Sequence, residues 1–171
     1  SLFDTILSNI DKKYGMYVIA PIQSADISQK LRMFPPEKLL IIDRYVNLGG
    51  DYSHVTQEFE QTTFHKLSEL FPRIKKYKKA VLFFKEDADY PVGIKKGFQK
   101  FVQTHQLKGE IIPAYQAGTL QKETLYIFIS ANNLFKLVKD CKIKGFQIGQ
   151  EIGIVSNSDY IVMEVISDGI T

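Results

Sequence analysis

The sequence predicts an α/β protein in which parallel sheets are flanked by helices on both faces and divided between two lobes. Short, continuous apolar runs alternate along the chain with segments whose apolar residues have helical spacing. Parallel strands that are buried on both faces read as such runs, and each pair needs a helical crossover. A break in composition over 46–53, which contains Gly49-Gly50, indicates a crossing between lobes. At 171 residues the chain is long enough for one large core or two small lobes.

The first lobe is predicted over 1–46. Its predicted elements are, in order, a helix over 2–10, a strand over 16–22, a short helix over 25–31 and a strand over 38–43. Gly15 stops the first helix, and Pro21 marks the exit of the first strand because proline lacks the N–H that a sheet needs. Two strands are few for a doubly wound sheet, so we expect this lobe to be incomplete in this chain.

The second lobe is predicted over 47–156, and residues 157–171 are expected to recross the hinge and return to the first lobe. The predicted elements are a helix capped by Thr56, a strand over 80–84, a helix opening at 89–91, strands over 110–113 and 125–129, a helix ended by Gly145, and a strand over 152–155. In the helix after 89–91, Ile94, Phe98 and Phe101 share one face at the spacing of an amphipathic helix.

Composition and charge are those of an ordinary globular protein. The net charge is 22 − 19 = +3, too small by itself to indicate nucleic-acid binding. The basic run over 73–79 fits either a solvated helix end or a phosphate-binding patch. Cys141 is the one cysteine, so no internal disulfide can form, which suits a reducing compartment. No membrane-spanning run or signal peptide is present, although the absence of an initiator Met leaves a removed signal peptide open.

Motifs for catalysis, cofactors and metals are missing from the sequence. Gly49-Gly50 lacks the Lys-Ser/Thr that would make a phosphate loop, and there is no Gly-x-Ser-x-Gly elbow. The three histidines, His54, His65 and His105, have no metal-ligand spacing. We therefore expect no cofactor, no metal and no enzyme activity.

Polar side chains follow three of the predicted strands, where open α/β sheets bind ligands. Asp43-Arg44 follows the run over 38–42, and an ionised Asp accepts strong hydrogen bonds from sugar hydroxyls. Ser130 and Ser158-Asp159 follow two strands of the second lobe. Each has a structural alternative: an Asp43–Arg44 pair that caps a loop, Ser130 as a helix N-cap, and Ser158-Asp159 as a turn.

Several segments together resemble the sensor domains of the LacI family of bacterial regulators and the periplasmic sugar-binding proteins of the same fold. The residues of these segments are most similar to those of GntR-family regulators whose sensor domain is LacI-like. The segments are YVIAP (17–21), LLIIDR (39–44), PVGIKKGF (91–98), YIFIS (126–130) and the closing GQEIGIVSNSD…GIT (149–171). The resemblance implies a periplasmic-binding-protein-like fold of type I with a ligand between the lobes.

The resemblance also implies roles for individual residues. The Asp that contacts the sugar carries over to Asp43, and the hinge carboxylates carry over to Ser158-Asp159, of which only the second is acidic. Ser130 stands where relatives have Asn, and Ile94 stands where LacI relatives have a sugar-gripping Arg. The LacI-type arginine is therefore missing. Tyr90 and Tyr45 are candidates to stack on a sugar face.

The leading hypothesis is the effector-sensing domain of a cytoplasmic bacterial transcription regulator. By resemblance, it would bind a small carbohydrate, form a homodimer and control DNA through a winged-helix domain outside this chain, with no membrane partner. The second hypothesis, a periplasmic sugar-binding protein of a transporter, shares the fold. A third is a small α/β enzyme that uses Asp159 as a general base.

Overall fold

The computed structural model describes residues 2–10 and 13–157, in two compact units, Ser1–Glu58 and Phe59–Thr171. No helix in the described part of the chain is long and apolar enough to cross a bilayer. The two units are described separately below.

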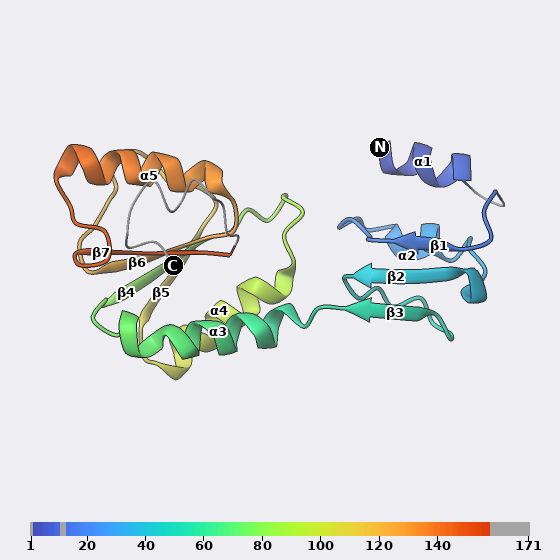
Figure 1. Cartoon of the computed structure of the whole chain (residues 1–171), viewed down its shortest axis with the longest axis horizontal. Coiled ribbons are helices and arrows are strands. Elements are labelled where there is room, and N and C mark those ends of the chain that lie inside the picture. The colour runs from blue at the N-terminus through green and yellow to red at the C-terminus, as the bar shows by residue number, and fades with distance from the viewer. Residues whose placement is uncertain (1, 11–12, 158–171) are drawn as a thin grey trace. The chain divides into compact units, whose positions relative to one another are not determined.

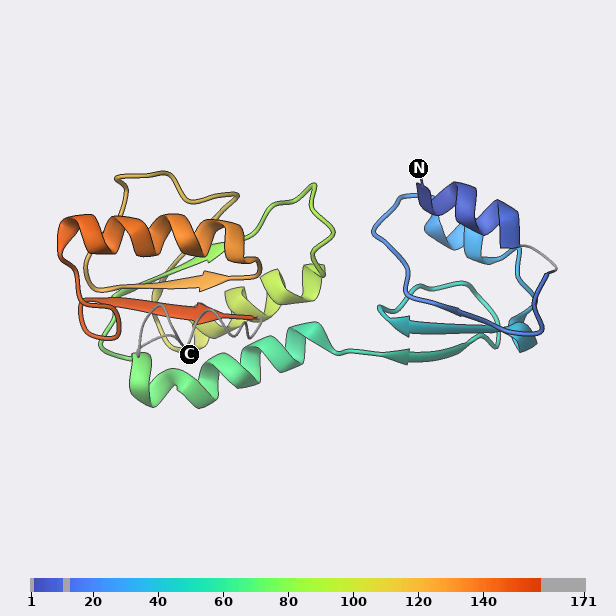
Figure 2. The same cartoon turned by 45° about the horizontal axis from the view of Figure 1, so that its top comes forward.

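The first unit is a three-stranded parallel sheet with helices on one side (Figure 1). Its elements are α1 (Leu2–Ile10), β1 (Tyr17–Ile19), α2 (Ile27–Leu31), the 3-10 helix η1 (Pro36–Lys38), β2 (Leu39–Asp43) and β3 (Ser53–Thr56), with strand order β1-β2-β3. Both α-helices lie against the same face of the sheet (Figure 2). A single core, which includes Leu31, Phe34 and Ile41, fills the space between them.

The opposite face of this sheet is open among the described residues. Along β1 the side chains alternate, so Tyr17 and Ile19 are buried while Val18 is 56% exposed. Val55 of β3 is 68% exposed. Parallel sheets are normally covered on both faces. The prediction that the first lobe is incomplete in this chain is therefore confirmed.

Strand β3 is a finding that the sequence analysis did not contain. Its residues are polar or exposed, so no apolar run marks it. It nevertheless pairs with β2, with Asp43 opposite Thr56. Thr56 thus ends a strand and is not the predicted helix cap; the next helix begins at Phe59. The first compact unit accordingly extends to Glu58, beyond the predicted lobe end at residue 46.

The second unit is a four-stranded, wholly parallel sheet covered on both faces. Its elements are α3 (Phe59–Ile74), β4 (Lys79–Phe83), α4 (Val92–Thr104), β5 (Lys108–Ile112), β6 (Thr124–Phe128), α5 (Ala131–Lys144) and β7 (Ile152–Ser156), with strand order β5-β4-β6-β7. Helices α3 and α4 lie on one face and α5 on the other (Figures 1 and 2). These strands and helices fall where the sequence predicted them, and the predicted α/β fold class is confirmed.

Each face of the second sheet has its own core. Ala80, Leu82 and Phe98 pack on the side of α3 and α4, whereas Val81, Phe83 and Leu134 pack on the side of α5. Cys141 is in the latter core, and burial raises the pKa of its thiol to about 11. This thiol therefore stays protonated at neutral pH and acts as a small apolar side chain.

Candidate functional site

Asp43 lies at the carboxyl end of β2 in an unusual backbone conformation. Its φ is +71°, a region that residues other than glycine rarely adopt. The N–H of Arg44 donates to the carbonyl of Ile42 at 2.9 Å, which closes a tight three-residue turn around Asp43. Such strain persists where neighbouring contacts hold it, and it gathers at functional sites. The turn thus holds Asp43 in a fixed backbone conformation at the end of β2.

Two neighbours fix this carboxylate. The side-chain amide of Gln57 donates to Asp43 Oδ1 at 2.7 Å, and Arg44 Nε lies 3.5 Å from Asp43 Oδ2. The Gln57 N–H also donates to the Asp43 carbonyl at 2.9 Å. The predicted Asp43–Arg44 pair therefore exists, and the carboxylate is still about one third exposed. The sequence analysis did not identify Gln57, because the strand that precedes it, β3, has no apolar run by which it could be recognised.

The topology of the second sheet marks a particular position at its carboxyl edge. From β4 the chain passes through α4 to β5 on one side, and then crosses back to β6 on the other side of β4. The strand order thus reverses between β4 and β6. In open α/β sheets this switch point is where ligands bind.

Tyr90 and Ser130 lie in the two loops that flank this switch point. Tyr90 is in the loop between β4 and α4, half-buried, with its ring 5.7 Å from that of Phe84. Ser130 follows β6 and is the N-cap residue of α5, but its hydroxyl makes no capping hydrogen bond. Ser130 thus occupies the N-cap position of the alternative interpretation, but it does not make the side-chain hydrogen bond of such a cap. Whether either side chain binds a ligand remains a prediction.

The remaining predicted residues lie at the end of β7. Ser158 and Asp159 are outside the described residues. Asn157, just before them, is described: its N–H donates to the carbonyl of Phe128 at 2.8 Å. Its exposed side chain therefore lies at the same edge as Ser130. The signal for Asn157 was present in the sequence, since it is polar and follows an apolar strand.

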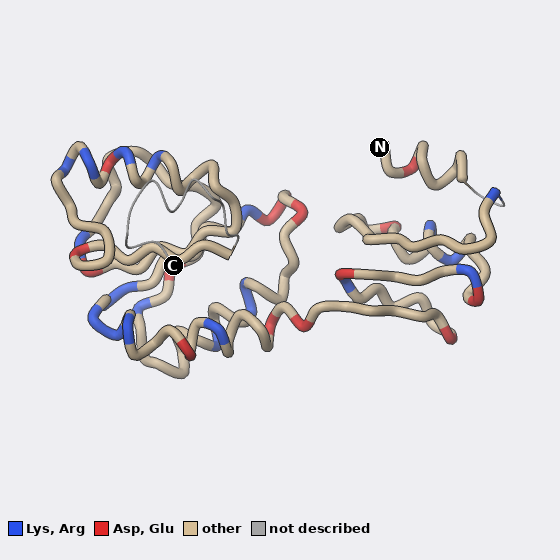
Figure 3. The backbone as a smooth tube through the Cα atoms, in the orientation of Figure 1, with Lys and Arg blue, Asp and Glu red and all other residues tan. Residues whose placement is uncertain are grey.

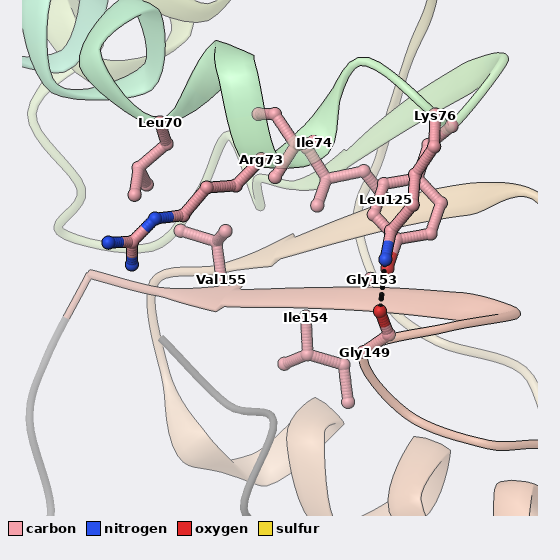
Figure 4. A pocket seen from close by; sticks show the side chains of 10 residues that line it. Leu70, Arg73, Ile74, Lys76, Leu125, Gly149, Gly153, Ile154 and Val155 are labelled. Atoms are coloured by element: carbon pink, nitrogen blue, oxygen red, sulfur yellow. Dashed lines mark hydrogen bonds between the residues drawn. The ribbon is translucent and has the colours of Figure 1, made fainter.

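The basic run over 73–79 lies at the turn between α3 and β4 (Figure 3). Most of its ammonium groups have structural partners. Lys78 pairs with Glu123 at 2.7 Å, and Lys79 pairs with Glu110. Lys76 donates to the carbonyl of Gly149, across a small pocket between the end of α3 and β7 (Figure 4). These contacts favour the helix-end interpretation of the run over a phosphate-binding patch.

The described residues contain no group of three or more His, Cys, Asp and Glu side chains that could hold a metal ion. His54 is exposed, and its ring lies 5.2 Å from that of Tyr45. His105 stacks on Phe71 with ring centroids 3.9 Å apart. Among the residues that the structure describes, the polar side chains at the strand ends, such as Asp43 and Ser130, can therefore make hydrogen bonds but form no metal site.

Comparison of the structure with solved structures finds the same fold in bacterial sugar-binding proteins. A LacI-family transcriptional regulator from Lactobacillus casei with bound glucose matches with a TM-score of 0.72 and 13% identity over 99% of this chain and 69% of its own. A probable maltose operon transcriptional repressor from Staphylococcus aureus matches with a TM-score of 0.73 and 10% identity, over 99% and 66%.

A third neighbour is the periplasmic binding protein of the arabinose transporter from Shewanella sp. ANA-3, bound to arabinofuranose. It matches with a TM-score of 0.67 and 13% identity over 90% of this chain and 58% of its own. No family model and no curated protein sequence matches the chain. At these identities the likeness establishes a periplasmic-binding-protein-like fold, of which this chain spans about two thirds in the two regulators.

Proposed function

We propose that this chain is the effector-sensing part of a bacterial transcription regulator and that it binds a small carbohydrate. The observation that carries the proposal is the set of single polar groups at strand ends, with Tyr90 and Ser130 beside the switch point of the second sheet. Such groups can donate to and accept from the hydroxyls of a sugar. The solved neighbours that carry glucose and sucrose are consistent with this ligand class.

In this proposal Asp43 provides the strongest single contact. An ionised carboxylate that accepts hydrogen bonds contributes about 1.5–3 kcal/mol per bond, more than a neutral acceptor does. Gln57 and the turn at Asp43 hold the carboxylate in one position before the ligand arrives. Arg44, Ser130, Tyr90, Ser158 and Asp159 are the further proposed contacts. Because Ile94 stands where LacI relatives have a sugar-gripping arginine, the identity of their sugar is not carried over to this chain.

The finer points of the proposal concern the whole protein. We place it among GntR-family regulators with a LacI-like sensor, acting in the cytoplasm as a homodimer, with DNA bound by a separate winged-helix domain. The ligand would shift the population of DNA-binding geometries only by its differential affinity for them. If the whole protein sediments as a monomer, the proposed homodimer is contradicted.

The first test is a thermal-unfolding screen against monosaccharides and sugar phosphates. A ligand at a hundredfold excess over its Kd should stabilise the protein by about 2.7 kcal/mol. In Asp43→Asn the ligand should bind about 10- to 100-fold more weakly, because a charge-assisted bond is lost. Asn is chosen because it tolerates positive φ and keeps the side chain's size.

The matched control is Asp51→Asn. Asp51 is an exposed carboxylate in the loop before β3, so it lies at the amino edge of the same sheet. Binding should be unchanged in this variant and reduced in Ser130→Ala. Equal losses in Asp43→Asn and Asp51→Asn would contradict the proposed site, and the absence of any stabilising sugar would contradict the ligand class.

A periplasmic sugar-binding protein is the second candidate, favoured by the arabinose-binding neighbour. The two functions predict different segments before this one in the whole protein. A winged helix there supports the regulator, whereas an export signal supports the transporter component. Binding of an operator fragment that a sugar releases or strengthens would decide for the regulator.

A further inference from the structure

The loop over 84–91 joins β4 to α4 and carries Tyr90 beside the switch point of the second sheet. Its backbone makes two short turns. The N–H of Ala88 donates to the carbonyl of Lys85 at 3.1 Å, and the N–H of Tyr90 donates to the carbonyl of Ala88 at 2.8 Å. These two hydrogen bonds shape the loop but do not tie it to α4, so its position against α4 depends on side-chain contacts.

One side chain of α4 reaches back to this loop. The ammonium of Lys95 pairs with the carboxylate of Glu86 and lies over the ring of Phe84, 5.9 Å from its centroid. Helical side chains lean toward the N-terminal end of their helix, which is the end that the loop enters. The Lys95 side chain is 30% exposed, whereas that of Glu86 is 68% exposed. Lys95 is thus the anchored member of the pair.

The helix that carries Lys95 is itself packed closely on α3. A Cβ at Gly93 would lie 2.8 Å from the backbone nitrogen of Glu60, so the first turn of α4 cannot move toward α3. Ile94, which precedes Lys95, is 4% exposed. Lys95 therefore extends from a helix end that close packing holds in one place.

Phe84 connects this ion pair to Tyr90. The ring of Phe84 is buried, and that of Tyr90 packs against it in an edge-to-face arrangement with centroids 5.7 Å apart. A cation over an aromatic ring at about 6 Å is attracted to it. Lys95 therefore contacts the loop at two residues, Glu86 and Phe84, and Tyr90 packs on the second of them.

We propose that Lys95 is a positioning residue of the carbohydrate site: through Glu86 and Phe84 it fixes the loop over 84–91 and so sets where Tyr90 stands. The inference rests on the proposed function, in which Tyr90 contacts the sugar. A contact that is held in place before the ligand arrives loses less entropy on binding. Because the pair is ionic and Glu86 is exposed, salt weakens it. Part of the salt dependence of sugar binding should therefore come from Lys95, although a sugar carries no charge.

The test compares Lys95→Met with the unaltered protein, since Met keeps most of the apolar stem and removes the charge. Two quantities are measured in the whole chain: the Kd of the monosaccharide that the thermal-unfolding screen selects, and the hydrogen exchange of the Ala88 and Tyr90 amides without ligand. At low salt the Kd should rise about threefold and both amides should exchange about threefold faster, the size of one partly exposed ion pair. High salt should bring the Kd of the unaltered protein toward that of the variant.

Lys95→Arg keeps the charge and should restore both the Kd and the slow exchange. The matched control is Lys66→Met, which breaks the exposed Lys66–Glu69 pair of α3, 2.9 Å long, and should change neither quantity. An unchanged Kd and unchanged exchange in Lys95→Met would overturn the inference, as would an equal effect in Lys66→Met. If the unaltered protein binds no monosaccharide, the proposed function is contradicted instead, while the exchange of the two amides still shows whether Lys95 holds the loop.

Discussion

The two units are built from the same parallel βα pattern, yet they differ in how completely the sheet is covered. The second unit has helices on both faces and a core on each. The first has helices and a core on one face, while Val18 and Val55 are exposed on the other. Because both sheets are parallel, the difference cannot come from strand direction. Whether a sheet is covered on one face or on both depends instead on where the helices that connect its strands lie.

The largest expected effect compares one valine in each sheet. Val81→Asp places a carboxylate at a position that is 2% exposed, and should destabilise the second unit by about 4 kcal/mol or more. Val18→Asp, at a central position of β1 on the open face, should change stability by less than about 0.5 kcal/mol. Chemical denaturation of both variants measures the difference. A large loss in Val18→Asp would mean that this face is covered in solution, and the comparison would fail.

The next effect concerns glycines. In α4, Gly97 lies so close to α3 that a Cβ would contact Glu60 O and come within 2.8 Å of Thr63 Cβ. Gly97→Ala should therefore destabilise the second unit by about 1–3 kcal/mol. Gly15 of the first unit has no such neighbour within 4 Å and no positive φ. Gly15→Ala should be neutral or stabilising by up to about 1 kcal/mol, because it restricts the unfolded chain.

Thermal or denaturant unfolding of this pair reports whether close helix packing distinguishes the second unit. If Gly97→Ala costs no more than Gly15→Ala, α3 and α4 are not held at the separation described above. A Gly97→Ser variant extends the test, since its larger side chain should cost more than alanine at the same position.

The sequence predicted what depends on local burial and missed what depends on pairing. Strands β4 and β6 were found because buried runs such as Ala80, Val81 and Leu82 have no other simple explanation. Strand β3 was missed because an exposed edge strand, with burial on neither face, carries no apolar signal. Its contact from Gln57 to Asp43 was missed for the same reason.

The candidate site shows the same limit. Polar residues after strands, such as Asp43 and Ser130, could be named from the sequence because strand ends are local features. The switch point between β4 and β6 could not, because strand order is set by crossovers between distant segments. The loop over 113–123 was equally hidden, because Tyr115 and Gly118 of this loop meet Asp140 of α5 only in the folded unit.

The smallest expected effect compares two carboxylates whose pKa is lowered for different reasons. Hydrogen bonds from the Gly118 N–H and the Tyr115 hydroxyl lower the pKa of Asp140 below its ordinary 3.8. In the first unit, hydrogen bonds from Lys30 and Ser24 lower the pKa of Asp26. A carboxylate with a lowered folded pKa stabilises the fold above its unfolded pKa, and this contribution is lost as the pH falls through the folded value. Both contributions should therefore begin to decline as the pH drops below about 3.8, and they should be gone below the lowered pKa of each folded-state carboxylate.

Salt should separate the two carboxylates. The Asp26–Lys30 pair is exposed and joins two full charges, so 1 M salt should screen it and return the pKa of Asp26 toward 3.8. Asp140 is held first by neutral donors, so its pKa should stay low. NMR titration of both carboxylates at low and high salt measures this. Equal upward shifts would show that the pKa of Asp140 depends on the nearby Lys144 and Lys139 charges and not on the hydrogen bonds from Gly118 and Tyr115.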